Sequence, residues 1–204
     1  MQIIKNSLLG LSLISFFLVN CNAKRSEVAY SIKHGDFNRV KELIEENKGL
    51  LLTKEKSCFA ENLSLLHWSI YNKKHEILEY LLSQFIKNNI IIENISDSKD
   101  RNLLLYATEQ ADPTSLKLLI KFGMKLPEKY KARRFLFKQA VWGHGNSSEV
   151  VECCKILLKE GLRYNFSNHD LDSISRYLDE EITNIAKKGM SHFAKFRNFI
   201  WKIL

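Results

Sequence analysis

The chain has 204 residues, and 45% of them are hydrophobic, which suits one globular domain. Only two prolines and eight glycines are present, which argues against a fold built from many β-turns. The 31 lysines and arginines outnumber the 23 acidic residues and give a formal net charge of +8. This charge favours acidic partners or anionic lipid surfaces; the alternative explanation is a solvated basic face.

The first 23 residues have the pattern of an export signal rather than of a folded domain. Lys5 supplies a positive start, and a mainly apolar run of 12 residues follows from Leu8 to Val19. A run of this length is sufficient for a signal peptide and too short for a helix that spans a membrane. An export signal also argues against nucleic-acid binding, despite the positive charge.

The end of this run reads F-L-V-N-C, from Phe17 to Cys21, and resembles a bacterial lipobox. In a lipobox, the signal peptide is cut before a cysteine that becomes lipidated. Asn20 departs from the usual Gly or Ala, as in the looser spirochaete-like form. The resemblance implies that residues 1–20 are a signal peptide and that Cys21 carries a lipid anchor. The alternatives are ordinary cleavage after Ala23 and a buried N-terminal helix.

An apolar pattern then returns every 38 residues. Four leucines mark it: Leu43, Leu81, Leu119 and Leu157. Each is followed by a second leucine or isoleucine, and an apolar residue lies three places earlier in every copy: Val40, Leu78, Leu116 and Cys154. Small residues lie 12 places before the first three leucines: Ser31, Ser69 and Ala107. A fixed period of this length is typical of stacked helical repeats, in which neighbouring repeats cover each other's apolar faces.

The second copy resembles an ankyrin repeat. It reads S-L-L-H-W-S-I-Y-N-K-K-H-E-I-L-E-Y-L-L from Ser64 to Leu82, against the usual T-P-L-H-x-A-A-x-x-G-H-x-E-(I/V)-V-x-L-L-L. The departures are a leucine for the proline and Lys73 for the turn glycine, which the first copy keeps as Gly35. The resemblance covers residues 27–161 and implies an all-α, ankyrin-like solenoid of about four helix-turn-helix repeats.

The resemblance also sets expectations for the parts outside the helix pairs. The segments between repeats are expected to form long loops or hairpin fingers over 47–62, 88–101 and 124–133. The helices of the fourth repeat are expected over 135–142 and 150–159. Residues 162–204 are expected to form a C-terminal helical cap, which a stack of repeats needs. The alternative is that Ser191 to Leu204 is a basic amphipathic helix that lies on a membrane or a partner.

In ankyrin-like stacks, the variable residues at the end of each first helix line the concave surface. Carried over to this chain, the partner-binding residues are Lys33, His34, Tyr71, Asn72, Glu109, Gln110 and Trp142, with Gly143 beside the last. Tyr71 and Trp142 are of most interest, because exposed aromatic residues often anchor interfaces; the alternative is that they are half-buried against the next repeat. His67 is expected to be structural, with its ring bonded to backbone near the turn.

No pattern for catalysis or for a cofactor is present. The chain has no G-x-S-x-G, no glycine-rich phosphate loop, no H-E-x-x-H and no C-x₂-C metal spacing. Cys153 and Cys154 are adjacent, and Cys154 lies in an apolar position of the repeat, so a disulfide framework is not expected.

The sequence therefore predicts a non-enzymatic scaffold or adaptor that binds another protein, one that is exported, lipid-anchored in the periplasm or on the cell surface, and monomeric. A soluble periplasmic or secreted protein is the alternative location. Two other functions stay open: a membrane-surface protein that engages anionic lipid through its basic C-terminal helix, and an extracytoplasmic immunity or inhibitor protein.

Overall fold

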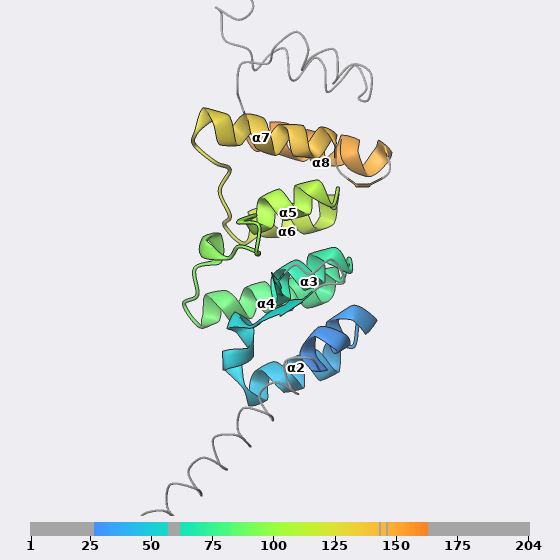
Figure 1. Cartoon of the computed structure of the whole chain (residues 1–204), viewed down its shortest axis with the longest axis vertical. Helices are drawn as coiled ribbons and strands as arrows, with labels where there is room; N and C mark the ends of the chain where they lie inside the picture. The colour runs from blue at the N-terminus through green and yellow to red at the C-terminus, as the bar shows by residue number, and fades with distance from the viewer. Residues whose placement is uncertain (1–26, 57–61, 143, 146, 163–204) are drawn as a thin grey trace, which may run out of the picture. The chain divides into compact units, whose positions relative to one another are not determined.

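The computed structural model describes four stretches of the chain (Figure 1): residues 27–56, 62–142, 144–145 and 147–162. These residues fold mostly into short helices that follow one another as helix pairs. The chain divides into two compact units. The first ends at Ile90 and also contains Ser96–Asp100, and the second consists of Ile91–Ile95 and the chain from Arg101 onward. The predicted all-α class is confirmed.

The first unit contains two helix pairs. Helical residues 27–34 and α2 (Phe37–Glu46) form the first pair, and α3 (Leu65–Tyr71) packs on α4 (His75–Lys87) to form the second. The α4 helix also contacts α2. The second helices of consecutive repeats are therefore stacked, as the 38-residue period requires.

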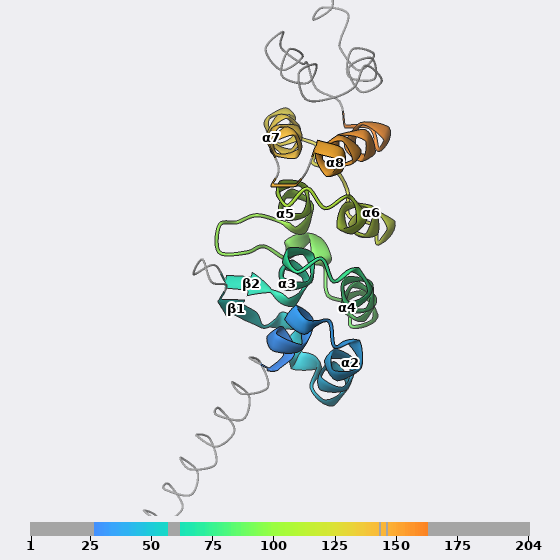
Figure 2. The same ribbon diagram turned by 90° about the vertical axis from the view of Figure 1, so that its right-hand side faces the viewer.

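A short hairpin lies between these two pairs along the chain. A 3-10 turn at Lys48–Leu52 leads into β1 (Lys54–Lys56), which pairs antiparallel with β2 (Asn62–Ser64). Figure 2 shows both strands beside α3, and β2 runs directly into that helix. The prediction of a loop or hairpin finger over 47–62 is confirmed, with the second strand reaching Ser64.

The second unit repeats the organisation of the first. In it, α5 (Leu103–Glu109) packs on α6 (Pro113–Lys121), and α7 (Tyr130–Val141) packs on α8 (Ser147–Lys159). Contacts of α7 with α5 and of α8 with α6 stack the fourth repeat on the third. Between α4 and α5 the chain forms only a 3-10 turn, Ile92–Asn94, and short irregular segments, as expected for 88–101.

The leucines of the 38-residue pattern lie in the core of the units. Leu43 and Leu81 in the first unit, and Leu119 and Leu157 in the second, are all 0% exposed. Complete burial of such a side chain contributes about 1.5–3 kcal/mol relative to leaving it in water. The small residues 12 places earlier are buried too, and they leave room for the paired helices to approach: Ser31, Ser69 and Ala107.

Polar side chains begin most of these helices at positions that also recur every 38 residues. Ser64 and Asn102 cap α3 and α5, each accepting a hydrogen bond from the backbone amide three residues on, at 3.3 and 2.9 Å. Asp36 and Asp112 cap α2 and α6 in the same way, at 3.0 and 3.1 Å. The corresponding residue of the second repeat is Lys74, which makes no side-chain cap.

The fourth repeat differs from its expected boundaries. Its first helix begins at Tyr130 instead of Phe135, so the expected loop over 124–133 is shorter than predicted. The five added residues include no proline or glycine, and Lys, Arg and Ala among them favour helix. Its second helix begins at Ser147, three residues before Val150.

Several sequence predictions fall on residues that lie outside the described ranges. These are the signal peptide over 1–20, the lipidated Cys21 and nearly all of the C-terminal segment over 162–204. Among the described residues, no helix is both long enough and apolar enough to cross a bilayer.

Candidate functional site

The residues expected to contact a partner in the first unit lie near the ends of its two first helices. Lys33 and His34 are exposed, and Tyr71 and Asn72 are half-buried. The side-chain amide of Asn72 donates a 2.8 Å hydrogen bond to the Trp68 carbonyl, so it helps to close the end of α3. Of these four residues, the exposed pair and Tyr71 therefore present the side chains best placed for a partner.

Each of these first helices carries one contact between aromatic rings, and one member of each contact occupies the same position of the repeat. Tyr30 is 64% exposed and contacts His34 with the two rings tilted by 43° and their centroids 4.2 Å apart. Trp68, one 38-residue period later, meets Tyr71 edge to face at 6.0 Å. The ankyrin resemblance predicted contacts at His34 and Tyr71 but not at Tyr30 and Trp68. Their shared place in the repeat was the signal that could have identified them.

In the second unit, the carboxylate of Glu109 already has a partner. The Arg101 guanidinium donates to it at 2.6 Å, and the two side chains are only 13% and 21% exposed. The same guanidinium lies 4.8 Å from the ring centre of Tyr106, which favours its position through a cation–π contact. Gln110, beside Glu109, is half-buried. Any partner that uses Glu109 would have to compete with Arg101.

Trp142 lies at the end of α7 and is 66% exposed. Seven residues earlier, Phe135 is 50% exposed, and Lys131 and Lys138 are exposed as well. The spacing of 4, 7 and 11 residues places all four side chains on one side of the helix. We call this row the α7 face: Lys131, Phe135, Lys138 and Trp142.

The opposite side of α7 is its packing side. Leu136, Phe137 and Ala140 are buried there, in the helix that contacts α5 and α8. Trp142 is the one residue of this helix that the ankyrin resemblance predicted as a partner contact. Phe135 was not among the expected contacts, although the helix expected over 135–142 contains both residues, because the ankyrin resemblance carries over only the residues at the end of each first helix.

His67 is structural, as expected. It is 0% exposed, and its Nδ1 lies 2.7 Å from the hydroxyl of Ser64, which also accepts a hydrogen bond from the His67 amide. The ring is therefore bonded to the side chain that begins α3, a contact that the sequence analysis had assigned to backbone near the turn. A histidine held in this way is a part of the fold rather than a candidate ligand.

Cys153 and Cys154 are buried and form no disulfide. Burial, with the nearby charges of Asp112 and Glu149 as lesser causes, raises the pKa of the Cys153 thiol to about 12. Burial also raises the pKa of Cys154. Both thiols stay protonated near neutral pH, where a thiol rather than a thiolate is a poor nucleophile. Within the described ranges, no cluster of histidine, cysteine and acidic residues is suited to hold a metal ion.

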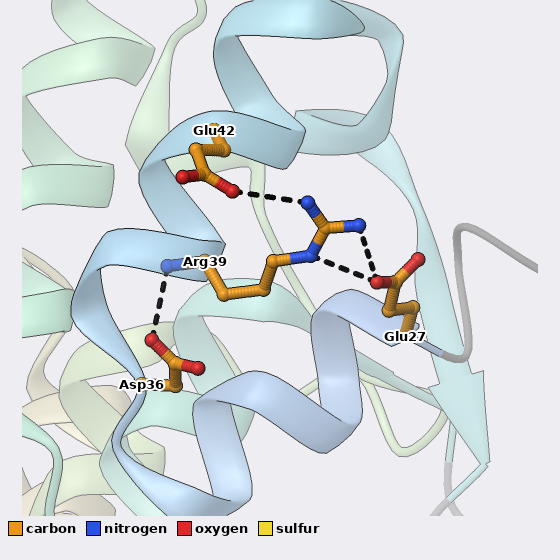
Figure 3. A network of polar contacts seen from close by, with 4 residues as sticks. All are labelled: Glu27, Asp36, Arg39 and Glu42. Carbon is orange, nitrogen blue, oxygen red and sulfur yellow. Dashed lines mark hydrogen bonds and ion pairs between the residues drawn. The ribbon is translucent and has the colours of Figure 1, made fainter.

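A polar network joins the two helices of the first pair (Figure 3). Arg39 on α2 donates from Nε to Glu27 at 2.8 Å and from Nη1 to Glu42 at 3.0 Å, and its amide is capped by Asp36. Hydrogen bonds to Glu27 and Glu42 raise the pKa of Arg39 above its ordinary value. The contact of Arg39 with Glu27 ties residues 27–34 to α2, so the role of this network is to hold the first helix pair together.

Stacked helix pairs that bury a periodic leucine core and expose the ends of their first helices define a repeat protein of the ankyrin type. Residues 26–130, about half of the chain, match the family model described as Ankyrin repeats (3 copies). The chain therefore belongs to the ankyrin-repeat family. Ankyrin repeats generally mediate protein–protein interaction and are typically not catalytic. The curated proteins contain no match to this chain.

Proposed function

We propose that the chain is a non-enzymatic adaptor that binds another protein through the exposed faces of its first helices. The observation that carries the proposal is the aromatic contact present on each first helix of the first unit, Tyr30 with His34 and Trp68 with Tyr71. Tyr30, 64% exposed, offers a large apolar surface beside a hydrogen-bonding group. Aromatic residues of this kind supply much of the energy of protein interfaces.

The geometry of these pairs also supports the proposal. The tilted contact of Tyr30 with His34 and the edge-to-face contact of Trp68 with Tyr71 restrain these side chains, which reduces the freedom that they lose on binding. Lys33 beside them adds a positive charge that favours an acidic partner. Glu109 and Gln110 are weaker candidates, because Glu109 is already paired with Arg101.

The adaptor is tested by capture of its partner from the native host, followed by measurement of the dissociation constant. A Tyr30→Ala/Tyr71→Ala variant should bind at least about tenfold more weakly, since loss of an aromatic anchor costs more than about 1 kcal/mol. The matched control is Leu52→Ala, which removes a side chain that is also 64% exposed but lies outside the first helices. Equal affinity of the wild type and the double variant would reject this surface.

We propose further that the chain is exported and held at a membrane through a lipid on Cys21. The support is the sequence alone: the apolar run after Lys5 and the F-L-V-N-C string. Two or more acyl chains hold a protein at a bilayer, whereas one binds only marginally. The mass of the mature N-terminus, measured in the native host, decides between an acylated Cys21 and cleavage after Ala23. An N-terminus that still begins at Met1 would reject both forms of the proposal.

A further inference from the structure

The α7 face is a narrow row of alternating cations and aromatic rings. Over the 11 residues from Lys131 to Trp142, a helix rises about 16 Å, so the row is about three turns long and one side chain wide. Phe135 and Trp142 are 50% and 66% exposed. Large aromatic side chains exposed together on one side of a helix are a mark of an interaction site rather than of random surface.

The charge of α7 is of one sign. From Lys129 to Trp142 the sequence contains five basic residues and no acidic one. Several of the cations lie in the first turns of the helix, where the helix dipole disfavours positive charge. An acidic ligand at this end of the helix would interact favourably both with the cations and with the helix dipole.

Neither helix that packs against α7 carries a net positive charge, because Glu149 and Glu152 balance the two lysines of α8. Neighbouring α5, which packs against α7, carries no basic residue between Asn102 and Gln110. A flat anionic surface, such as a membrane, would be better matched by cations spread over several helices. A single row of cations fits a ligand that is itself narrow and acidic.

We propose that the α7 face docks an acidic, amphipathic helical segment of the partner protein. Its carboxylates pair with Lys131 and Lys138, and its apolar side chains pack on Phe135 and Trp142. The inference rests on the proposed adaptor function and gives the partner a chemical class. In such a helix-to-helix contact, the bound segment uses side chains that lie three, four and seven residues apart.

The test measures binding of a labelled synthetic peptide to the purified full chain by fluorescence anisotropy. The probe is a helical peptide of about 20 residues with four glutamates and two phenylalanines seven residues apart. A second peptide replaces every glutamate by glutamine. The wild-type chain should bind the acidic peptide at least about tenfold more tightly than the amide peptide, and the difference should shrink as salt is added.

Variants of the chain locate the binding. Phe135→Ala and Trp142→Ala should each weaken the acidic peptide about tenfold. Lys131→Gln/Lys138→Gln should weaken it about three- to tenfold, because partly exposed ion pairs are individually modest, and should reduce the salt dependence. The control, Lys121→Gln/Lys159→Gln, removes the same charge from exposed residues of α6 and α8 and should change the affinity less than about twofold. Thermal melts identify any variant that loses its fold. If an aromatic variant unfolds, the comparison of Lys131→Gln/Lys138→Gln with its control still tests the inference.

Three results would overturn the inference. The first is no preference for the acidic peptide, or equal weakening by the control pair. The second is salt-sensitive sedimentation with phosphatidylserine vesicles that requires Phe135 and Trp142 while the peptide does not bind, which would assign the face to a membrane. The third is tighter peptide binding when Asp179, Glu180 and Glu181 are changed to their amides. That outcome would assign the face to the chain's own C-terminal segment.

The inference and the proposed function fail separately. Suppose that partner capture depends on Tyr30 and Tyr71, is unchanged by Phe135→Ala, and that the peptide does not bind. This result rejects the inference about the α7 face and leaves the adaptor function in place. Conversely, the peptide could bind at the α7 face while the Tyr30→Ala/Tyr71→Ala variant leaves partner capture unchanged. This result rejects the surface proposed for the first unit.

Discussion

At the scale of single residues, three turn positions one repeat apart keep the same backbone with different side chains. Gly35, Lys73 and Ala111 all have positive φ, at +75°, +51° and +46°. Glycine adopts this conformation without a steric penalty, whereas a residue with a Cβ pays about 1–2 kcal/mol. The second and third repeats therefore carry strain at a turn that the first repeat makes freely.

Changing Lys73 to glycine should stabilise the first unit. The relief of the left-handed strain exceeds the extra chain entropy that glycine loses on folding, which leaves a gain of about 0.5 kcal/mol. Urea denaturation followed by circular dichroism measures the change. Gly35→Ala is the reciprocal control and should lose about 1 kcal/mol. A shift of both variants in the same direction would contradict this explanation of the turn.

The buried thiols predict a loss of stability at alkaline pH. An unfolded thiol has a pKa of about 8.5, while burial raises that of Cys153 to about 12 and also raises that of Cys154. Below pH 8.5 the thiols are neutral in both states and their effect is constant. Above it the unfolded chain ionises first, so stability is lost as pH rises, by about 2 kcal/mol per thiol at pH 10.

The measurement is the free energy of unfolding between pH 7 and pH 10, with a Cys153→Ala/Cys154→Ala variant as the comparison. The variant is less stable at pH 7 because it leaves small cavities, but its stability should fall less steeply across this range. Parallel curves for the two proteins would show that the thiols are not shielded from ionisation.

At the scale of helices, the capping residues recur with the 38-residue period of the core. Asp36 and Asp112 begin α2 and α6, and Lys74 holds the same position before α4 without a capping bond. A cap of this kind is worth about 1 kcal/mol, and a carboxylate also interacts favourably with the helix dipole. The uncapped second repeat is therefore open to stabilisation.

The variant Lys74→Asp should raise the free energy of unfolding by about 1 kcal/mol. Asp112→Ala, which removes the matching cap of α6, should lower it by about 1–2 kcal/mol, because Asp112 also accepts the Ser115 hydroxyl at 2.6 Å. Chemical denaturation of both variants beside the wild type gives the two values. No gain from Lys74→Asp would show that the turn around Lys73 prevents the carboxylate from reaching the helix.

The limits of sequence reasoning also appear at this scale. The period predicted the existence of the helix pairs and their buried faces, because apolar spacing reports directly on burial. It did not predict that α7 begins at Tyr130, since its basic first turn has no apolar signal. Nor did it predict the ion pair of Arg101 with Glu109, because these residues lie eight apart and meet only through the path of the folded chain.

At the scale of the whole molecule, the chain divides into two units, each with its own fully buried leucines. Leu81 packs in the first unit and Leu157 in the second, and both are fully buried. In repeat proteins each repeat depends on its neighbours, so the loss of one core position weakens those stacked on it. The period of the leucines predicted this core correctly and left the boundary between the units undetermined, because the pattern continues through it without a break.

Leu81→Asp should unfold at least the first unit, because an unpaired carboxylate in the core costs several kcal/mol. Hydrogen exchange followed by mass spectrometry should show loss of protection throughout α2, α3 and α4. Leu52→Asp is the control, since Leu52 is 64% exposed and should accept the charge with little effect. Wild-type protection in α4 of the Leu81 variant would contradict the core described for this unit.

The two enclosed sulfur atoms of α8 have a consequence for where such a chain can mature. Cys153 and Cys154 are buried and form no disulfide, so the folded helix depends on no oxidised cysteine. Glutathione in a cytosol and disulfide catalysts beyond an inner membrane would both leave the pair untouched. Its redox state therefore gives no information about the compartment in which the protein works.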